Sequence, residues 1–255
     1  MNNFNDYEHV VIDGFGTLYD KNFIPLEGAS RLLDVISDKG ILFSNMGSIS
    51  GLQLKDRLNG KFEFLPRKVI TSLDILCRFL ISENIKTIYH YGGKRADRTL
   101  RNITRIVNSI DKPVNALVFT SLPDDNWIKE SQAILRYIYR HRDAKMILAN
   151  PDRLLPGKHV GLNVGMMFDM LSQNWPRQEF NLSKIEIGKP LLKRSDLGLN
   201  HKEHVLVIGD NNFTDGGLAK ALDADFILIS EFAEMNTNHN WCYLSLEALL
   251  SDFDV

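Results

Sequence analysis

Short aliphatic runs that each end in a polar residue constrain this chain more than any other feature. The first run is Val10-Val11-Ile12, which Asp13 and a glycine-containing turn follow, and similar runs end at Ser44 and Asp210. Uninterrupted aliphatic runs of this length are typical of strands that are buried on both faces, as in parallel sheets. The pattern therefore predicts an α/β protein built on a parallel sheet.

A helical segment separates the first two of these strands. From Ala29 onward apolar residues recur with helical spacing, and Lys39-Gly40 is a typical helix end. A strand, a helix and a second strand joined by short links form a βαβ unit with parallel strands. Because parallel strands end at the same edge of a sheet, we expect Asp13 and Ser44 at one edge, where open α/β sheets bind ligands.

The middle of the chain repeats the alternation of strands and helices. Strands are expected at residues 87–91, 116–120 and 145–149, and an amphipathic helix at 127–141. The last of these strands runs into the polar turn Asn150-Pro151-Asp152. This section therefore contains enough elements for an α/β domain of its own.

We accordingly interpret residues 74–183 as a domain inserted into a first domain made of residues 1–73 and 184–255. A helix is expected from Val69 through Leu80, at the first junction. The chain then returns to the first pattern, because its last third holds the aliphatic run that ends at Asp210.

Composition and charge exclude several classes of protein. The chain of 255 residues is 44% hydrophobic and 24% charged, which is typical of a globular protein. A net charge of -2 without a long basic stretch gives no surface for nucleic acid. The first residues lack the cationic start and apolar core of a signal peptide, and no apolar run is long enough to span a bilayer. We therefore expect a cytoplasmic protein without a membrane partner.

Several strand-end residues are expected to meet at the carboxyl edge of the first sheet. They are Asp13, Ser44, Lys189, and the pair Asp210 and Asp215. Asp13 and Asp210 offer the oxygen ligands that Mg²⁺ prefers. Ser44 and Lys189 offer hydrogen-bond donors to phosphate oxygens, and Asp215 either orients a metal-bound water or holds Lys189. Taken alone, Ser44 could cap a helix, and Lys189 could be an ordinary surface lysine. The occurrence of all these residues together favours phosphoryl transfer.

These motifs resemble those of the haloacid dehalogenase (HAD) superfamily. The first family motif, Asp-x-Asp-Gly-Thr, corresponds to Asp13-Gly14-Phe15-Gly16-Thr17, and the second, a strand-terminal Ser or Thr, to Ser44. The third, a lysine, corresponds to Lys189, and the fourth, Gly-Asp-x-x-x-Thr-Asp, to residues 209–215. The resemblance covers essentially the whole chain. It implies a Rossmann-like core, a Mg²⁺ site, and hydrolysis of phosphate monoesters through a phosphorylated Asp13.

The inserted domain resembles the C2-type cap of the class IIA branch of that superfamily. The likeness lies in Ala149-Asn150-Pro151-Asp152 with the glycine-spaced loop after it, and in Gly188-Lys189-Pro190. It implies that the cap selects the substrate and, by resemblance alone, a homodimer formed through the cap. The substrate-binding residues expected on this basis are Ser44, Asn45, Lys189, Asn150 and Asp152. A plain turn explains Asn150 and Asp152 equally well.

The sequence departs from the first family motif at Phe15. In the family, an Asp at this position protonates the leaving group and then deprotonates the attacking water. General acid–base catalysis of this kind contributes about 10²–10⁴-fold to the rate, and a phenyl ring cannot provide it. The backbone carbonyl of Phe15 can still bind metal, so the implied metal ligands are Asp13, Phe15, Asp210 and Asp215.

Three hypotheses follow from this substitution. The favoured one is a Mg²⁺-dependent phosphatase for a small phosphorylated metabolite, which is slow or restricted to leaving groups of low pKa. The second is a catalytically impaired protein that binds a phosphorylated ligand or has a regulatory role. The third, a purely structural module, explains poorly why Asp13, Lys189, Asp210 and Asp215 occur together.

Overall fold

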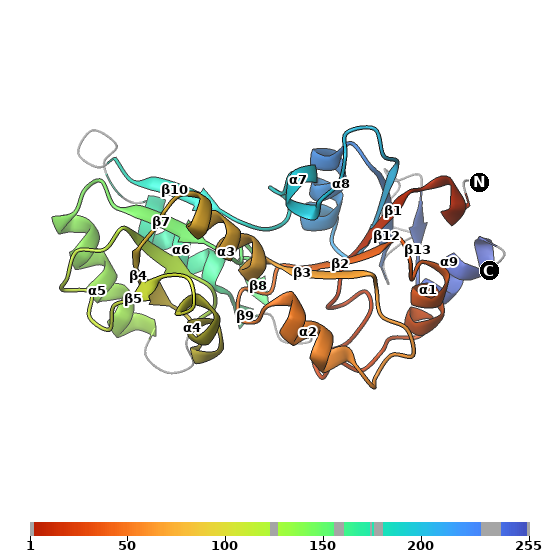
Figure 1. The fold of residues 1–255 in the computed structure, drawn as a ribbon, viewed down its shortest axis with the longest axis horizontal. Coiled ribbons are helices and arrows are strands. Elements are labelled where there is room, and N and C mark those ends of the chain that lie inside the picture. Colours follow the sequence, from red (N-terminus) through yellow and green to blue (C-terminus); the bar gives the residue numbers. More distant parts are fainter. Residues whose placement is uncertain are drawn as a thin grey trace. The chain divides into compact units, whose positions relative to one another are not determined.

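The chain forms two compact units (Figure 1). The structure is a computed structural model that describes residues 3–122, 127–155, 161–173, 175, 181–230 and 241–253. The first unit comprises Met1–Ser44, Gly51–Ile70 and Lys189–Val255, and the second comprises Asn45–Ser50 and Thr71–Gly188. Each unit has a sheet of its own.

The first unit is built on a six-stranded sheet with the order β13-β12-β11-β1-β2-β3. Strand β1 pairs in parallel with both β2 and β11, and the pairs β11–β12 and β12–β13 are also parallel. The predicted α/β fold with a parallel sheet is confirmed. The strands are β1 (His9–Ile12), β2 (Gly40–Ser44), β3 (Lys68–Thr71), β11 (Val205–Gly209), β12 (Asp225–Ile229) and β13 (Cys242–Tyr243).

Helices lie on both sides of this sheet, with α7 and α8 on one side and α1 and α9 on the other (Figure 1). Every residue of β2 and of β11 is buried, as expected for strands covered on two faces. The helices of this unit are η1 (Phe4–Asp6), α1 (Ala29–Val35), α2 (Gly51–Leu58), α7 (Arg194–Leu197), the π-helical turn η2 (Asn212–Gly216), α8 (Gly217–Leu222) and α9 (Leu246–Asp252).

The strand order reverses direction at β1, because the chain continues to β2 on one side and reaches β11 on the other. The register aligns Ile12 with Ile208, and the backbone N–H of Asp13 donates to the carbonyl oxygen of Ile208 over 2.9 Å. In open parallel sheets, ligands bind at the carboxyl ends of strands at such a point. Asp13 and Asp210 follow these two strands directly.

The second unit has a five-stranded parallel sheet with the order β10-β7-β6-β4-β5, and a small antiparallel hairpin, β8–β9. The strands are β4 (Thr87–Tyr91), β5 (Arg105–Ile106), β6 (Ala116–Phe119), β7 (Lys145–Leu148), β8 (Leu154–Leu155), β9 (Gly161–Leu162) and β10 (Ser183–Glu186). The helices are α3 (Ser72–Ser82), α4 (Lys94–Leu100), α5 (Trp127–Arg140) and α6 (Val164–Gln173). Among the described residues, no helix is long and apolar enough to cross a bilayer.

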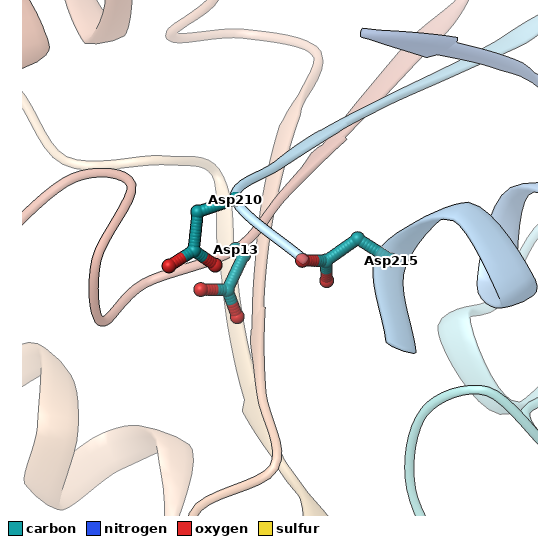
Figure 2. A group of neighbouring side chains, drawn as sticks. All are labelled: Asp13, Asp210 and Asp215. Atoms are coloured by element: carbon teal, nitrogen blue, oxygen red, sulfur yellow. The ribbon is translucent and has the colours of Figure 1, made fainter. Parts of the chain in front are cut away.

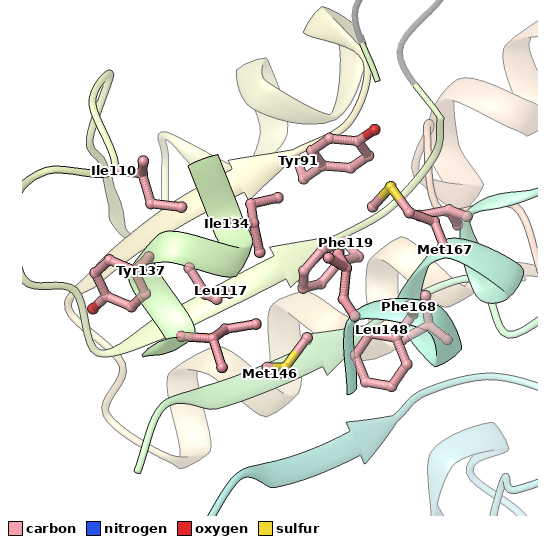
Figure 3. Packing of buried hydrophobic residues seen from close by; sticks show 13 residues of the cluster. Tyr91, Ile110, Leu117, Phe119, Ile134, Tyr137, Met146, Leu148, Met167 and Phe168 are labelled. Atoms are coloured by element: carbon pink, nitrogen blue, oxygen red, sulfur yellow. The ribbon is translucent and has the colours of Figure 1, made fainter. Parts of the chain in front are cut away.

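An apolar cluster joins α5 and α6 to one face of this second sheet (Figure 3). Phe119 on β6 lies at its centre, with its ring 5.5 Å from that of Phe168 on α6 and 5.7 Å from that of Tyr91 on β4. Ile134 and Tyr137 contribute from α5. The amphipathic helix expected at 127–141 therefore packs its apolar side on the sheet.

Several boundaries differ from those expected from the sequence. Residues 45–50 and 71–73 are expected in the first domain but belong to the second unit. Residues 184–188 are expected in the first domain, but β10 pairs with β7 and therefore belongs to the second unit. A short strand in which polar and apolar residues alternate carries no local signal of which sheet it joins. The helix expected from Val69 is wrong at its start, because residues 68–71 form β3. The β-branched residues there favour a strand, and α3 begins only at Ser72, where Thr71 and Asp74 form a capping box.

Candidate active site

Three aspartates gather at the carboxyl edge of the first sheet (Figure 2). Asp13 follows β1, Asp210 follows β11, and Asp215 lies on η2. One carboxylate oxygen from each lies within 4.8 Å of the others. The sequence predicted this convergence from the strand ends, and the structure brings the three residues together.

Lys189 lies within this group of carboxylates. Its ammonium donates to Asp13 Oδ1 and, over 2.6 Å, to Asp215 Oδ1. The residue is only 3% exposed, so this lysine is a buried cation rather than a surface one. Of the two roles expected for Asp215, the structure therefore provides the contact with Lys189.

Two glycines allow the carboxylates to approach the backbone this closely. Gly16 has φ +89°, and a Cβ added to it would lie 2.1 Å from Asp210 Oδ2. A Cβ added to Gly209 would lie 2.3 Å from Asp215 Oδ2. Any larger residue at either position would displace one of the aspartates.

The turn η2 fixes the position of Asp215. The side-chain oxygen of Asn211 accepts from the N–H groups of Phe213 and Thr214, at 2.9 and 3.2 Å, and so caps the turn. The N–H of Asn211 in turn donates to Asp215 Oδ2 over 3.1 Å. Both oxygens of Asp215 therefore accept hydrogen bonds, one from the backbone and one from Lys189.

Burial and neighbouring charges shift the pKa values of Asp13 and Lys189. Burial raises the pKa of Asp13, and the charges of Asp215 and Asp210 raise it further, while Lys189 opposes both effects. Burial alone would lower the pKa of Lys189, but the carboxylates of Asp13 and Asp215 outweigh it and raise that pKa. The site holds more negative than positive charge, which favours binding of a further cation.

The donor set fits a hard divalent cation. Every side chain in the cluster offers carboxylate oxygen, which Mg²⁺ prefers over nitrogen or sulfur. Asp13 and Asp210 are partly exposed, whereas Asp215 is 1% exposed and already accepts two hydrogen bonds. Asp13 and Asp210 are therefore the ligands that this geometry favours, and the carbonyl of Phe15 stays a predicted third.

Ser44 ends β2, as expected, and is 5% exposed. Tyr19, which the sequence did not single out, packs against Gly14, the residue after Asp13, where an added Cβ would lie 2.3 Å from the Tyr19 hydroxyl oxygen. The Tyr19 side chain is 1% exposed, and burial raises its pKa, as does the negative charge of Asp13. The one signal for Tyr19 in the sequence is its position in the loop after Asp13, which is also compatible with a simple core residue.

The other three predicted substrate-binding residues form a hydrogen-bonded group within the second unit. The side-chain amide of Asn45 donates to Asp152 Oδ1 over 2.8 Å, and the N–H of Asp152 donates to Asn150 Oδ1 over 3.2 Å. Arg153 supports this turn by pairing with Asp169 and Glu186. The structure thus brings Asn45, Asn150 and Asp152 together and shows the polar turn that was the alternative interpretation.

Comparisons with known proteins identify the fold. No protein-family model matches the sequence, and no curated protein matches it in sequence. Solved structures do match. A p-nitrophenyl phosphatase from Archaeoglobus fulgidus aligns with TM-score 0.78 and 21% identity, over 97% of this chain and 99% of that one.

Two further solved structures share the same fold. A hydrolase of the haloacid dehalogenase-like family from Brucella suis 1330 aligns with TM-score 0.74 and 21% identity, over 94% of this chain and 96% of that one. A glycerol phosphate phosphatase from Mycobacterium tuberculosis, in complex with magnesium, aligns with TM-score 0.71 and 19% identity, over 98% of this chain and 79% of that one. The chain therefore shares the fold of HAD-like phosphatases over almost its whole length.

Proposed function

We propose that this chain is a Mg²⁺-dependent phosphatase of the HAD type that acts on a small phosphorylated metabolite through an aspartyl-phosphate on Asp13. The observation that carries the proposal is the buried Lys189 ammonium between Asp13 and Asp215, next to Asp210. A buried cation surrounded by carboxylates is costly for a fold and typical of a catalytic site. The phosphatases that share the fold support the same reaction class.

In the first step, a carboxylate oxygen of Asp13 attacks the phosphorus atom of the monoester. The new bond joins Asp13 to phosphorus, and the bond from phosphorus to the leaving oxygen breaks with its electron pair on that oxygen. In the second step, water attacks the same phosphorus atom, the bond to Asp13 breaks, and inorganic phosphate and a proton are released. Asp13 is then a carboxylate again.

The neighbouring side chains stabilise the charge on the transferring group. Lys189 and the Ser44 hydroxyl donate hydrogen bonds to phosphoryl oxygens, and Asp215 keeps the Lys189 ammonium in place. Asp13, Asp210 and the backbone carbonyl of Phe15 would hold Mg²⁺, which would supply further positive charge against the phosphoryl oxygens.

Phe15 restricts which substrates turn over quickly. The leaving oxygen needs a proton when its conjugate acid has a high pKa, and the phenyl ring cannot donate one. Leaving groups of low pKa need no such proton. We therefore propose faster turnover of acyl and aryl phosphates than of alkyl phosphates, while the attack of water on the phosphorylated Asp13 lacks a base from position 15 with every substrate.

The test of the reaction is turnover of 4-nitrophenyl phosphate and acetyl phosphate with Mg²⁺, in the wild type and in Asp13→Asn. The wild type should release phosphate, and the variant should lose about 10³-fold or more of the rate. Acid-quenched wild-type protein should carry one phosphoryl group by mass spectrometry, and Asp13→Asn none. If neither protein releases phosphate above background, while the folded wild type binds inorganic phosphate, the catalytically impaired phosphate-binding protein replaces this proposal.

A second variant tests the role assigned to Phe15. Phe15→Asp should raise kcat on an alkyl phosphate such as glycerol phosphate by about 10²-fold, because it restores the proton donor. Turnover of 4-nitrophenyl phosphate should rise less, since that leaving group needs little protonation and only the attack of water gains a base. No gain on alkyl phosphates in a folded, Mg²⁺-binding variant means that proton transfer does not limit the site.

A further inference from the structure

The chain passes from one unit to the other at four peptide bonds, the crossings, and buried polar residues of the second unit lie next to them. The crossings follow Ser44, Ser50, Ile70 and Gly188. Asn45 and Thr71 come directly after two of them and are 6% and 0% exposed. The Thr71 hydroxyl donates to the carbonyl oxygen of Ile49 over 2.8 Å, one residue before a third crossing. Thr71 thus ties two crossings together inside the second unit.

Asn45 joins the two crossings that lead to Ser44 and Lys189. Its side-chain Oδ1 accepts a hydrogen bond from the hydroxyl of Ser72 over 3.4 Å. Gly188 packs on the same oxygen, because an added Cβ would lie 2.6 Å from it, and its φ of +126° also favours glycine. Asn45 directly follows Ser44 in the chain. Gly188 directly precedes Lys189, so the carboxamide lies beside the backbone that leads to both groups.

Asp152 holds the other end of this carboxamide. Asn45 Nδ2 donates to Asp152 Oδ1 over 2.8 Å, although the two residues are 107 positions apart in the sequence. The turn that carries Asp152 closes without this bond, because Asn150 Oδ1 accepts from the N–H of Asp152 over 3.2 Å. The carboxylate of Asp152 is therefore not needed for the turn, and it orients Asn45 instead.

Arg153 makes this anchor rigid. Its guanidinium pairs with Asp169 on α6 over 3.0 Å and with Glu186 on β10 over 3.1 Å. Each carboxylate accepts two hydrogen bonds from Arg153, the arrangement that restricts such a pair most. Glu186 lies two residues before Gly188. Arg153 therefore connects the turn with Asp152 to the strand that ends at the last crossing.

We propose that Asn45 is a positioning residue, whose carboxamide keeps the backbone next to Ser44 and Lys189 in the geometry that phosphoryl transfer needs. Asp152 sets the orientation of that carboxamide. This inference rests on the proposed function, and it gives Asn45 a role other than the contact with substrate expected from the sequence. A displacement of about 1 Å in a catalytic group can cost about 10²-fold in rate. Because Ser44 and Lys189 act on the transferring phosphoryl group, their displacement should lower kcat more than it raises KM.

The test exchanges the donor and the acceptor of the bond between Asn45 and Asp152. Asn45→Asp places two carboxylates opposite each other, and it should lower kcat for 4-nitrophenyl phosphate with Mg²⁺ by about 10–100-fold while KM changes less. The double variant Asn45→Asp/Asp152→Asn again pairs one amide with one carboxylate, so it should regain most of the lost kcat. Tm is measured for every variant, which separates a loss of folding from a loss of rate.

Asn200→Asp is the matched control. The side-chain amide of Asn200 donates to Glu203 Oε1 over 2.9 Å, at an exposed position just before the amino end of β11. The same chemical change there also places two carboxylates opposite each other. It should lower Tm and leave kcat and KM unchanged. A loss of kcat in both single variants contradicts a specific role of Asn45.

The double variant decides between positioning and a direct contact with substrate. The exchange restores the hydrogen bond between the two side chains, but it cannot restore a contact that either original group makes with substrate. A double variant that does not regain kcat, whatever its Tm, therefore overturns the proposal, as does Asn45→Asp with unchanged kcat. A folded wild type that releases no phosphate overturns the proposed function, and this inference with it.

Discussion

The two units are both built on parallel sheets, but they differ in the residues at the carboxyl ends of their strands. In the first unit, the ionisable residues Asp13 and Asp210 follow β1 and β11, and Lys189 lies buried beside them. In the second unit, the neutral residues Thr120 and Asn150 lie just beyond β6 and β7. The architecture alone thus creates an edge where ligands can bind, and the residues at the strand ends decide whether it can perform chemistry.

The units also differ in the interactions that stabilise the folded chain around those strand ends. The first unit buries charged groups, whose loss of hydration costs free energy that their pairing only partly offsets. In the second unit, the buried side chain of His90 pairs with the partly exposed carboxylate of Asp97 and, over 2.8 Å, with Thr120 Oγ1, next to an apolar cluster. We therefore expect the loss of a charged side chain to lower the unfolding free energy more in the first unit than in the second.

The largest effect is expected for Lys189→Met. The variant leaves Asp13 and Asp215 buried without their common cation, which should cost about 3–5 kcal/mol of unfolding free energy and abolish turnover. Lys145→Met in the second unit is the control, because the Lys145–Glu83 pair spans 3.7 Å and is partly exposed to solvent. It should cost less than about 1 kcal/mol in urea denaturation. Equal losses of unfolding free energy in Lys189→Met and Lys145→Met would contradict the proposed difference between the two units.

A smaller effect is expected for Gly16→Ala. Both Gly16 and Gly60 have positive φ, but a Cβ at Gly60 would meet nothing within 4 Å, whereas a Cβ at Gly16 would collide with Asp210. Gly60→Ala should cost about 1–2 kcal/mol from backbone strain alone. Gly16→Ala should cost more and weaken Mg²⁺ binding by about 10–100-fold, measured by calorimetry, because it displaces a ligand. Unchanged Mg²⁺ affinity in a folded Gly16→Ala variant argues against Asp210 as a ligand.

The smallest effect is expected for Asp152→Ala in the second unit. The variant leaves the Asn45 amide without the acceptor at 2.8 Å, which should cost about 1–3 kcal/mol. Asp143→Ala, at an exposed position, should change stability by less than about 0.5 kcal/mol. Measuring Tm together with KM separates the two interpretations of Asp152. A purely structural turn lowers Tm at unchanged KM, whereas a substrate contact raises KM as well.

The sequence predicted that Asp13, Lys189, Asp210 and Asp215 come together in the first unit, because strand ends are a local signal. An aliphatic run followed by Asp13 or Ser44 places a polar side chain at a sheet edge whatever the rest of the chain does. The contact between Lys189 and Asp215 was one of two alternatives, since it depends on the shape of η2. Tyr19 was missed, because its burial beneath Gly14 depends on how the loop after β1 folds back and not on residue spacing.

Some elements of the fold were predicted from the sequence and others were not. Long aliphatic strands and the helix α5 were expected, but the two-residue strands β5, β8, β9 and β13 were not, because elements this short depend on tertiary pairing. The sheet to which β10 belongs was also mistaken. Its residues Lys184-Ile185-Glu186 alternate in polarity and would suit an edge strand of either sheet.

The division of the chain at Asn45–Ser50 has a consequence for protein engineering. The chain passes from one unit to the other at four peptide bonds. One of these directly follows Ser44, and another directly precedes Lys189. The second unit therefore consists of two chain segments and cannot be replaced as one continuous insertion. Swapping it for the corresponding part of a protein with the same fold would require splices directly next to Ser44 and Lys189. Variation of substrate range is better sought by substitutions inside the second unit, which leave those four joints intact.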